Sequence, residues 1–146
     1  MQTHLVIGNI FSLSCAICIA MSVVKKSKKD FMYWQIGCTL FGGIANIVLY
    51  AYAAFVISSV SLIRDILSYK NKLTKNITIV LLVISIIIGL YANNLDIIGL
   101  LPIIASASYT LCIYITKNEQ QMRWALVSNL SLWFIHNLYI QAYPSA

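Results

Sequence analysis

Long apolar stretches that alternate with short polar segments constrain this chain more than any other feature. A bilayer crossing by a helix takes about 20 apolar residues. Six apolar stretches of 15 to 20 residues follow one another, over residues 5–24, 33–52, 55–69, 77–91, 97–116 and 124–142. Moreover, 60% of the residues are hydrophobic and only 10% are charged, whereas a soluble domain has about 25% charged residues. The sequence therefore predicts an all-α, polytopic membrane helix bundle, with residues 1–146 forming one transmembrane domain of six helices.

All basic residues except Arg64 lie in three of the segments between these stretches. Lysines and arginines cluster in residues 25–30, 70–75 and 117–123, and by the positive-inside rule these loops are cytoplasmic. We therefore expect the N-terminus and the turn at 93–96 outside. Because the net charge of +6 comes from these loops, it indicates topology and a lipid bilayer as partner, with no nucleic acid. The first stretch has no basic residues before it, so we expect it to remain as a helix and not to be cleaved as a signal peptide.

Near the end of the chain, three polar or aromatic residues share one helix face. Trp133, His136 and Asn137 are spaced i, i+3 and i+4. Hydrocarbon offers no hydrogen bonds to an imidazole or an amide, so this face is expected to turn inward. We expect Ser106 and Ser131 on the same interior face. Two interpretations stay open, namely hydrogen bonding between helices and a substrate or proton site.

One adjacent pair of opposite charges falls inside the third stretch. Arg64 either snorkels to the interface or forms an ion pair, with Asp65 or with another helix. Neighbouring side chains diverge on a helix, so Arg64 and Asp65 are not expected to satisfy each other. The Cys15-x-x-Cys18 spacing lies in a lipid-embedded helix without a second ligand pair, so the cysteines are expected to pack as small apolar residues. No metal and no cofactor are expected.

The chain also aligns with itself after a shift of 91 residues. Lys26 then falls on Lys117 and Asn46 on Asn137, and the first two helices fall on the last two. Both units start outside, so the repeats are parallel. The predicted first repeat is residues 1–70, the connector helix is residues 71–92, and the incomplete second repeat is residues 93–146.

Several short motifs carry a resemblance to known membrane proteins. They are Tyr52-Ala53-Ala54, Ser61-Leu62-Ile63-Arg64, Leu100-Leu101-Pro102-Ile103, Trp133-Phe134-Ile135-His136-Asn137 and Tyr143-Pro144. With these motifs the chain resembles the YgjV-type bacterial inner-membrane family, and its helix plan resembles the SWEET and PQ-loop transporters. The resemblance implies a multi-pass protein of the bacterial inner membrane. In the SWEET-like plan the third helix of each unit lines the pocket, and Ser61 holds that position here. No Pro-Gln pair occurs.

A departure from the SWEET-like plan concerns the second unit, which has no counterpart of the third helix. The interior face of the last two helices then lacks one wall. We expect a second copy to supply it, in a symmetric homodimer with the last helix near the interface. The alternatives are that the chain is a fragment of a longer one, or that the third and fourth helices close over the gap in a monomer.

Two functions of different classes fit these features. The first is a transporter of a small polar solute, with Trp133 as a stacking surface, His136 and Asn137 as hydrogen-bonding groups, and Asn46 and Ser61 opposite them. The alternative is a non-transporting scaffold or accessory subunit whose polar residues only hold helices together. An enzyme is not expected, because Asp65 is the only acid and His136 the only histidine near membrane depth.

Overall fold

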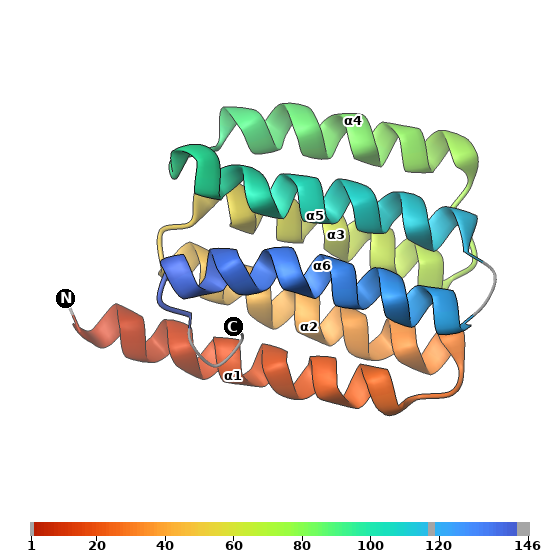
Figure 1. The fold of residues 1–146 in the computed structure, drawn as a ribbon, viewed down its shortest axis with the longest axis horizontal. Coiled ribbons are helices and arrows are strands. Elements are labelled where there is room, and N and C mark those ends of the chain that lie inside the picture. The colour runs from red at the N-terminus through yellow and green to blue at the C-terminus, as the bar shows by residue number, and fades with distance from the viewer. Residues whose placement is uncertain (1, 117–118, 143–146) are drawn as a thin grey trace.

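Six antiparallel α-helices make up the described part of the chain. The computed structural model describes residues 2–116 and 119–142, and the helices follow one another up and down along one axis (Figure 1). Their bounds are α1 Gln2–Val24, α2 Lys28–Val48, α3 Tyr52–Tyr69, α4 Lys75–Tyr91, α5 Asp96–Ile115 and α6 Glu119–Tyr139. The predicted all-α class and the number of helices are confirmed.

The ends of α2 and α6 differ most from the sequence-based prediction. Each begins and ends several residues earlier than expected from the apolar stretches, which ran over residues 33–52 and 124–142. Tyr50 and Gln141 adopt left-handed backbone conformations, with φ of 61° and 62°, and each lies just past its helix. The predicted stretch over residues 33–52 ran past the end of α2, because the chain turns at Tyr50 and α3 already begins at Tyr52. At their N-terminal ends, both α2 and α6 extend beyond the apolar stretch into the polar sequence that precedes it.

Four of the helices are long and apolar enough to cross a membrane by length and composition, namely α1, α2, α3 and α5. The other two fall short for different reasons. α4 is apolar but has only 17 residues. α6 has 21 residues but carries more polar side chains, including Asn129, His136 and Asn137. A helix of this composition is stable in a bilayer only if neighbouring protein covers its polar side.

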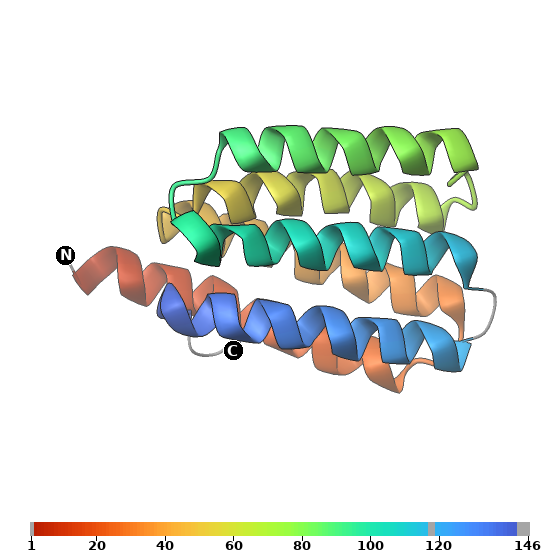
Figure 2. The ribbon, with the colours of Figure 1, turned by 45° about the horizontal axis from the view of Figure 1, so that its top comes forward.

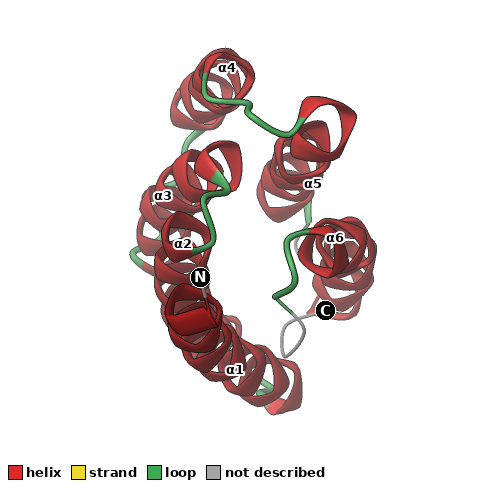
Figure 3. Cartoon of the chain, turned by 90° about the vertical axis from the view of Figure 1, so that its left-hand side faces the viewer, coloured by secondary structure: helices red, strands yellow, loops and turns green. Residues whose placement is uncertain are grey.

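The helices form two walls that face each other. α1, α2 and α3 pack side by side in chain order as one curved wall, and α5 and α6 form the other (Figure 3). α3 packs against α5, which joins the walls along one side. α4 lies outside this junction and packs on both α3 and α5 (Figure 2). α1 and α6 do not pack along each other, so the two walls are least closely joined there.

Two apolar clusters lie toward opposite ends of the bundle. The cluster near the end with the lysine-rich loops has bulky side chains, and it consists of Phe31, Met32, Tyr109, Ile113, Met122 and Leu126. The cluster at the other end has mostly small ones, and it consists of Ala51, Ala54, Ile140 and Ala142, with Trp133 packed against it. The polar interior lies between them.

α4 contacts the rest of the bundle mainly through small and hydroxyl side chains. Its buried residues are Thr78, Leu81, Ser85 and Gly89, and most of the others are exposed. A Cβ atom at Gly89 would come within 2.9 Å of side-chain atoms of both Ile57 and Ile103. A side chain at this position would therefore force α4 away from α3 and α5.

Candidate functional site

A cavity of about 80 Å³ lies between the two walls. One buried water needs about 10–15 Å³ by this measure, so the cavity is large enough for a small solute or a few waters. Five helices line it, α4 being the exception among the six. The lining residues with polar side chains or thiols are Cys15, Gln35, Cys38, Thr39, Asn46, Ser58, Ser61, Arg64, Ser106, Tyr109, Asn129, Trp133 and Asn137.

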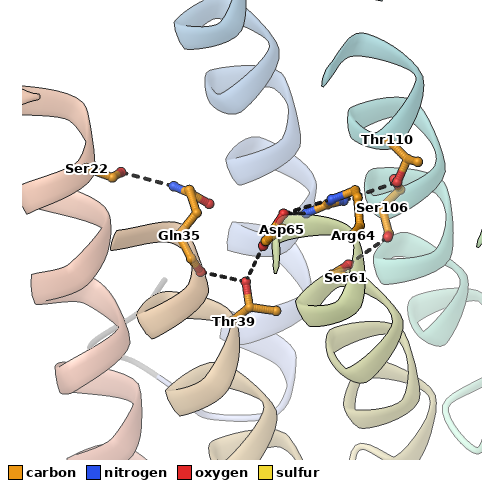
Figure 4. Close-up of polar contacts among 8 residues, drawn as sticks. All are labelled: Ser22, Gln35, Thr39, Ser61, Arg64, Asp65, Ser106 and Thr110. Atoms are coloured by element: carbon orange, nitrogen blue, oxygen red, sulfur yellow. Dashed lines mark hydrogen bonds and ion pairs between the residues drawn. The ribbon is translucent and has the colours of Figure 1, made fainter. Parts of the chain in front are cut away.

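Arg64 and Asp65 of α3 form a buried ion pair at this cavity. Arg64 donates to Asp65 Oδ1 from Nε at 2.9 Å and from Nη2 at 2.7 Å (Figure 4). The two side chains are 4% and 0% exposed. Arg64 lines the cavity, whereas Asp65 lies behind it. Burial of both partners rules out snorkelling of Arg64 to an interface in this structure.

Of the alternatives left open for Arg64, the structure shows the ion pair with Asp65. The two Cβ atoms diverge from each other, but the long arginine side chain curls back and brings its Nε edge to the carboxylate. As expected for neighbours on one helix, the two residues do not satisfy each other fully, and other helices complete the pair. Arg64 Nη1 donates to Thr110 Oγ1 of α5 at 3.2 Å, and Thr39 Oγ1 of α2 lies 2.8 Å from Asp65 Oδ2. Three helices are thus joined at one ion pair.

An aromatic ring also supports the guanidinium group. The guanidinium carbon of Arg64 lies 4.9 Å from the centre of the Tyr109 ring, a cation–π arrangement. Tyr109 is 2% exposed, and its hydroxyl has no hydrogen-bond partner among the described residues. The Oδ1 atom of Asn129 is likewise buried without a partner there. Both residues line the cavity, so they offer a solute a hydroxyl group and an acceptor.

Further hydrogen bonds join the helices around the cavity. The Ser61 and Ser106 hydroxyls lie 2.9 Å apart between α3 and α5, beside the ion pair in Figure 4. Asn46 Nδ2 donates to Ser58 Oγ at 3.3 Å between α2 and α3. Both bonds tie α3 to a neighbour. The lining is therefore fixed by contacts between side chains as well as by helix packing.

The predicted site residues are only partly brought together. Trp133, Asn137, Asn46 and Ser61 all line the cavity. His136 is fully buried, in agreement with its expected inward orientation, but it is not a lining residue. Its ring packs edge-on against Trp133 with centroids 5.6 Å apart, and its Nδ1 lies 3.5 Å from Asn137 Oδ1. In this structure His136 thus supports the cavity residues from behind.

One further expectation was wrong. Ser131 was expected on the interior face but is exposed, and its hydroxyl donates to the backbone oxygen of Val127 at 2.9 Å. That internal bond satisfies the hydroxyl without a partner helix, so a serine can face outward on α6. Ser106, by contrast, is buried as expected.

Sequence analysis missed Gln35 and Thr39 of α2. Together with Gly42 and Asn46 they follow a spacing of three or four residues, which puts all four on one helix face. This stripe of polar and small residues inside an apolar stretch is the signal that could have revealed them. All four line the cavity.

The cysteines show no sign of a metal centre. Within residues 2–116 and 119–142 no group of three or more potential ligands comes together, and all four thiols are free. The Sγ atoms of Cys15 and Cys38 lie 3.2 Å apart between α1 and α2. Both line the cavity, so these two thiols are part of the candidate site rather than of a purely apolar contact.

A helical bundle with long apolar helices and a polar, ion-paired interior defines a multi-pass integral membrane protein. Residues 6–146 match the family model Imp-YgjV, described as bacterial inner membrane protein. The chain belongs to this family, and the resemblance stated from its motifs is confirmed. No curated protein and no solved structure is significantly similar to the chain. The family assignment gives location in the bacterial inner membrane.

Proposed function

We propose that this protein transports a small polar solute across the inner membrane, and that the cavity between the two walls is its binding site. All six helices cross the bilayer in this proposal, with the lysine-rich loops in the cytoplasm. α1–α3 and α5–α6 are two parallel units joined by α4, and the solute passes by alternating access between them. Transport rather than catalysis is the proposed activity.

The observation that carries this proposal is a relation between the cavity residues of the two walls. Six pairs of lining residues lie 91 positions apart. They are Cys15 and Ser106, Gln35 and Leu126, Cys38 and Asn129, Thr39 and Leu130, Gly42 and Trp133, and Asn46 and Asn137. Transporters built from repeats bind their solute at the interface between them. A cavity lined by corresponding positions of both units is what this arrangement requires.

The ends of the helices follow the same spacing. α2 and α6 begin at Lys28 and Glu119 and end at Val48 and Tyr139, so both ends differ by 91 positions. The backbone after each helix also matches. Ala51 N donates to Asn46 O and Ala142 N donates to Asn137 O, each at 2.9 Å. Turns of the same conformation at corresponding positions support the proposal that the two units are repeats with a common ancestral conformation.

Within the site, the residues have distinct roles. Trp133 provides a flat apolar surface, and the amides of Asn46 and Asn137 face the cavity from opposite walls. Ser61 adds a hydroxyl group from α3, next to Ser106. His136 positions Trp133 and Asn137 through its ring and Nδ1 contacts. The lining thus combines stacking with hydrogen bonding, as small-solute sites do.

Uptake into proteoliposomes tests the proposal. The full chain is reconstituted and offered a panel of radiolabelled sugars, polyols, amino acids and carboxylates. We expect saturable uptake of at least one solute, and a loss of roughly tenfold or more in Trp133→Ala. Phe134→Ala is the matched control, since Phe134 is an exposed aromatic residue on the same helix. No uptake of any solute, or equal uptake by both variants, would favour a scaffold or accessory subunit instead.

The proposed orientation has its own test. A cysteine at Lys28, in a variant without native cysteines, is expected to react with an impermeant thiol reagent only from the cytoplasmic side. A cysteine at Asn94, in the turn between α4 and α5, is expected to react from the outside. Labelling of the Lys28→Cys variant from the outside of intact cells would reverse the assigned topology.

A further inference from the structure

The hydroxyl group of Thr39 has more acceptors than it can serve. Its Oγ1 lies 2.7 Å from the backbone oxygen of Gln35 and 2.8 Å from Asp65 Oδ2, and both distances are those of a good O–H···O hydrogen bond. A threonine hydroxyl carries one proton. If Asp65 is ionised, only one of the two contacts is a full hydrogen bond, and the other brings two lone pairs together.

A proton on Asp65 removes this conflict. With the proton on Oδ2, Asp65 donates to Thr39 Oγ1, and the Thr39 hydroxyl donates to the Gln35 backbone oxygen. Both short contacts are then hydrogen bonds. Asp65 Oδ1 remains the acceptor for Arg64 Nε and Nη2. The row from Gln35 through Thr39 and Asp65 to Arg64 in Figure 4 therefore suits a protonated carboxyl group.

We propose that Asp65 is a reversible proton-binding site, with its proton held on Oδ2 by Thr39, and that the proton binds together with an anionic group of the solute. The first part stands on the contacts of Asp65 alone. The second part rests on the proposed transport function, because it assigns the class of solute bound in the cavity.

Charge balance links the proton to an anion. The ionised pair of Arg64 and Asp65 is neutral overall, whereas the protonated pair has a charge of +1. An uncompensated buried charge is costly, and Arg64 lines the cavity while Asp65 does not. Three of the five guanidinium N–H groups make hydrogen bonds. One N–H on each Nη is left, which suits the two oxygens of a carboxylate.

Among the residues that the structure describes, no other charged group near Asp65 provides this compensation. Cys38 on α2 and Tyr109 on α5 interact with Asp65 electrostatically. On α4, which packs against α3, the only titratable residues are Lys75 and Tyr91 at the two ends. Among the described residues that line the cavity, Arg64 is the one with a formal charge. A small carboxylate is therefore the solute class that the proton-loaded site favours.

Infrared spectroscopy of the full chain in lipid nanodiscs tests the proton site. A background variant, Asp30→Asn with Asp96→Asn, removes two exposed carboxyl groups and leaves Asp65 as the sole aspartate. Labelling with ¹³C-aspartate then shifts the C=O band of protonated Asp65 without changing that residue. We expect this band to appear reversibly when the sample is acidified under conditions in which the protein stays folded. Absence of a label-sensitive band at every pH at which the protein stays folded would overturn the proton site.

Thr39 variants test the proposed geometry. Thr39→Val is nearly isosteric and removes the acceptor for the carboxyl proton, so we expect a weaker band, equivalent to roughly tenfold lower proton affinity. Thr39→Ser keeps a hydroxyl group and is expected to retain the band. Equal bands in both variants would overturn the role of Thr39.

Added lactate tests the pairing with an anion. If proton and carboxylate bind together, each raises the affinity for the other by the same factor. At fixed pH and ionic strength, lactate is therefore expected to strengthen the Asp65 band, and glycerol and chloride are not. No response to lactate, or an equal response to glycerol, would overturn the anion assignment. These spectra need no transport, so a titrating band without any uptake would refute the proposed function and still support the proton site.

Discussion

The two walls of the bundle have matching helix ends but different chemistry. On α2, the cavity positions Gln35, Thr39 and Gly42 are polar or small, whereas the positions 91 residues later on α6 are Leu126, Leu130 and Trp133. The ion pair and its hydrogen bond to Thr39 also belong to the first wall. Shared backbone geometry therefore does not imply shared roles. The first wall carries the charge, and the second supplies apolar surface with two asparagines.

The largest loss of stability is expected when Arg64, the buried charge on the first wall, is left without its partner. Asp65→Ala leaves the buried Arg64 without its counter-ion, which typically costs about 3–5 kcal/mol of unfolding free energy. Reversible unfolding in bicelles measures this loss. Asp30→Ala, an exposed carboxyl in the first turn of α2, is the control and should cost at most about 1 kcal/mol. Replacing both partners, as in Arg64→Met with Asp65→Leu, should recover much of the loss. Equal costs for the two single variants would contradict the assigned role of the pair.

A smaller loss of stability is expected from single substitutions at corresponding positions of the two walls. Thr39→Val leaves the buried carboxyl group of Asp65 without a hydrogen-bond partner at Oδ2 and changes the side-chain volume little, so it should cost about 1–3 kcal/mol. Leu130→Val, 91 positions later, only trims an apolar side chain and should cost about 1 kcal/mol. The same unfolding measurement compares them. If the second substitution costs more, the division of roles between the walls is wrong.

The two asparagines test whether the walls act equally on a solute. Asn46 and Asn137 both line the cavity. If each donates or accepts one hydrogen bond with the transported solute, replacement by alanine should lower the uptake rate at low solute concentration about tenfold in both cases. Proteoliposome uptake measures this change. A loss of uptake in Asn137→Ala but not in Asn46→Ala would show that the first wall contributes charge but does not recognise the solute directly through Asn46.

The smallest effect is expected outside the cavity. Ser131 is exposed on α6 and bonded to its own helix. Ser131→Ala should therefore change stability by no more than about 0.5 kcal/mol and leave uptake unchanged. A larger effect on either quantity would show that this face of α6 is covered, as the predicted homodimer requires.

Sequence reasoning predicted the six helices but not the contacts between them at the cavity. The apolar stretches fix six helices, and the 91-residue shift follows from residues such as Asn46 and Asn137. The helix ends were missed by several residues because the left-handed turn at Tyr50 has no glycine to mark it. The link between Thr39 and Asp65 was missed because a sequence does not show which faces of α2 and α3 meet. His136 stood out as an isolated ionisable residue, yet its place beside rather than in the cavity depends on the rotation of α6.

The fit of α4 at Gly89 has a consequence for the rate of the alternating-access exchange proposed above. α4 is the helix that packs against both walls, and at Gly89 it meets Ile57 and Ile103 without a side chain of its own. Small residues at a helix crossing leave little to interlock, so packed helices can slide past one another with modest barriers. A bulky residue at this point would wedge between α3 and α5 and hold one arrangement of the walls. Exchange on the microsecond-to-millisecond timescale, measured by NMR relaxation dispersion, would then slow even where solute affinity stays the same.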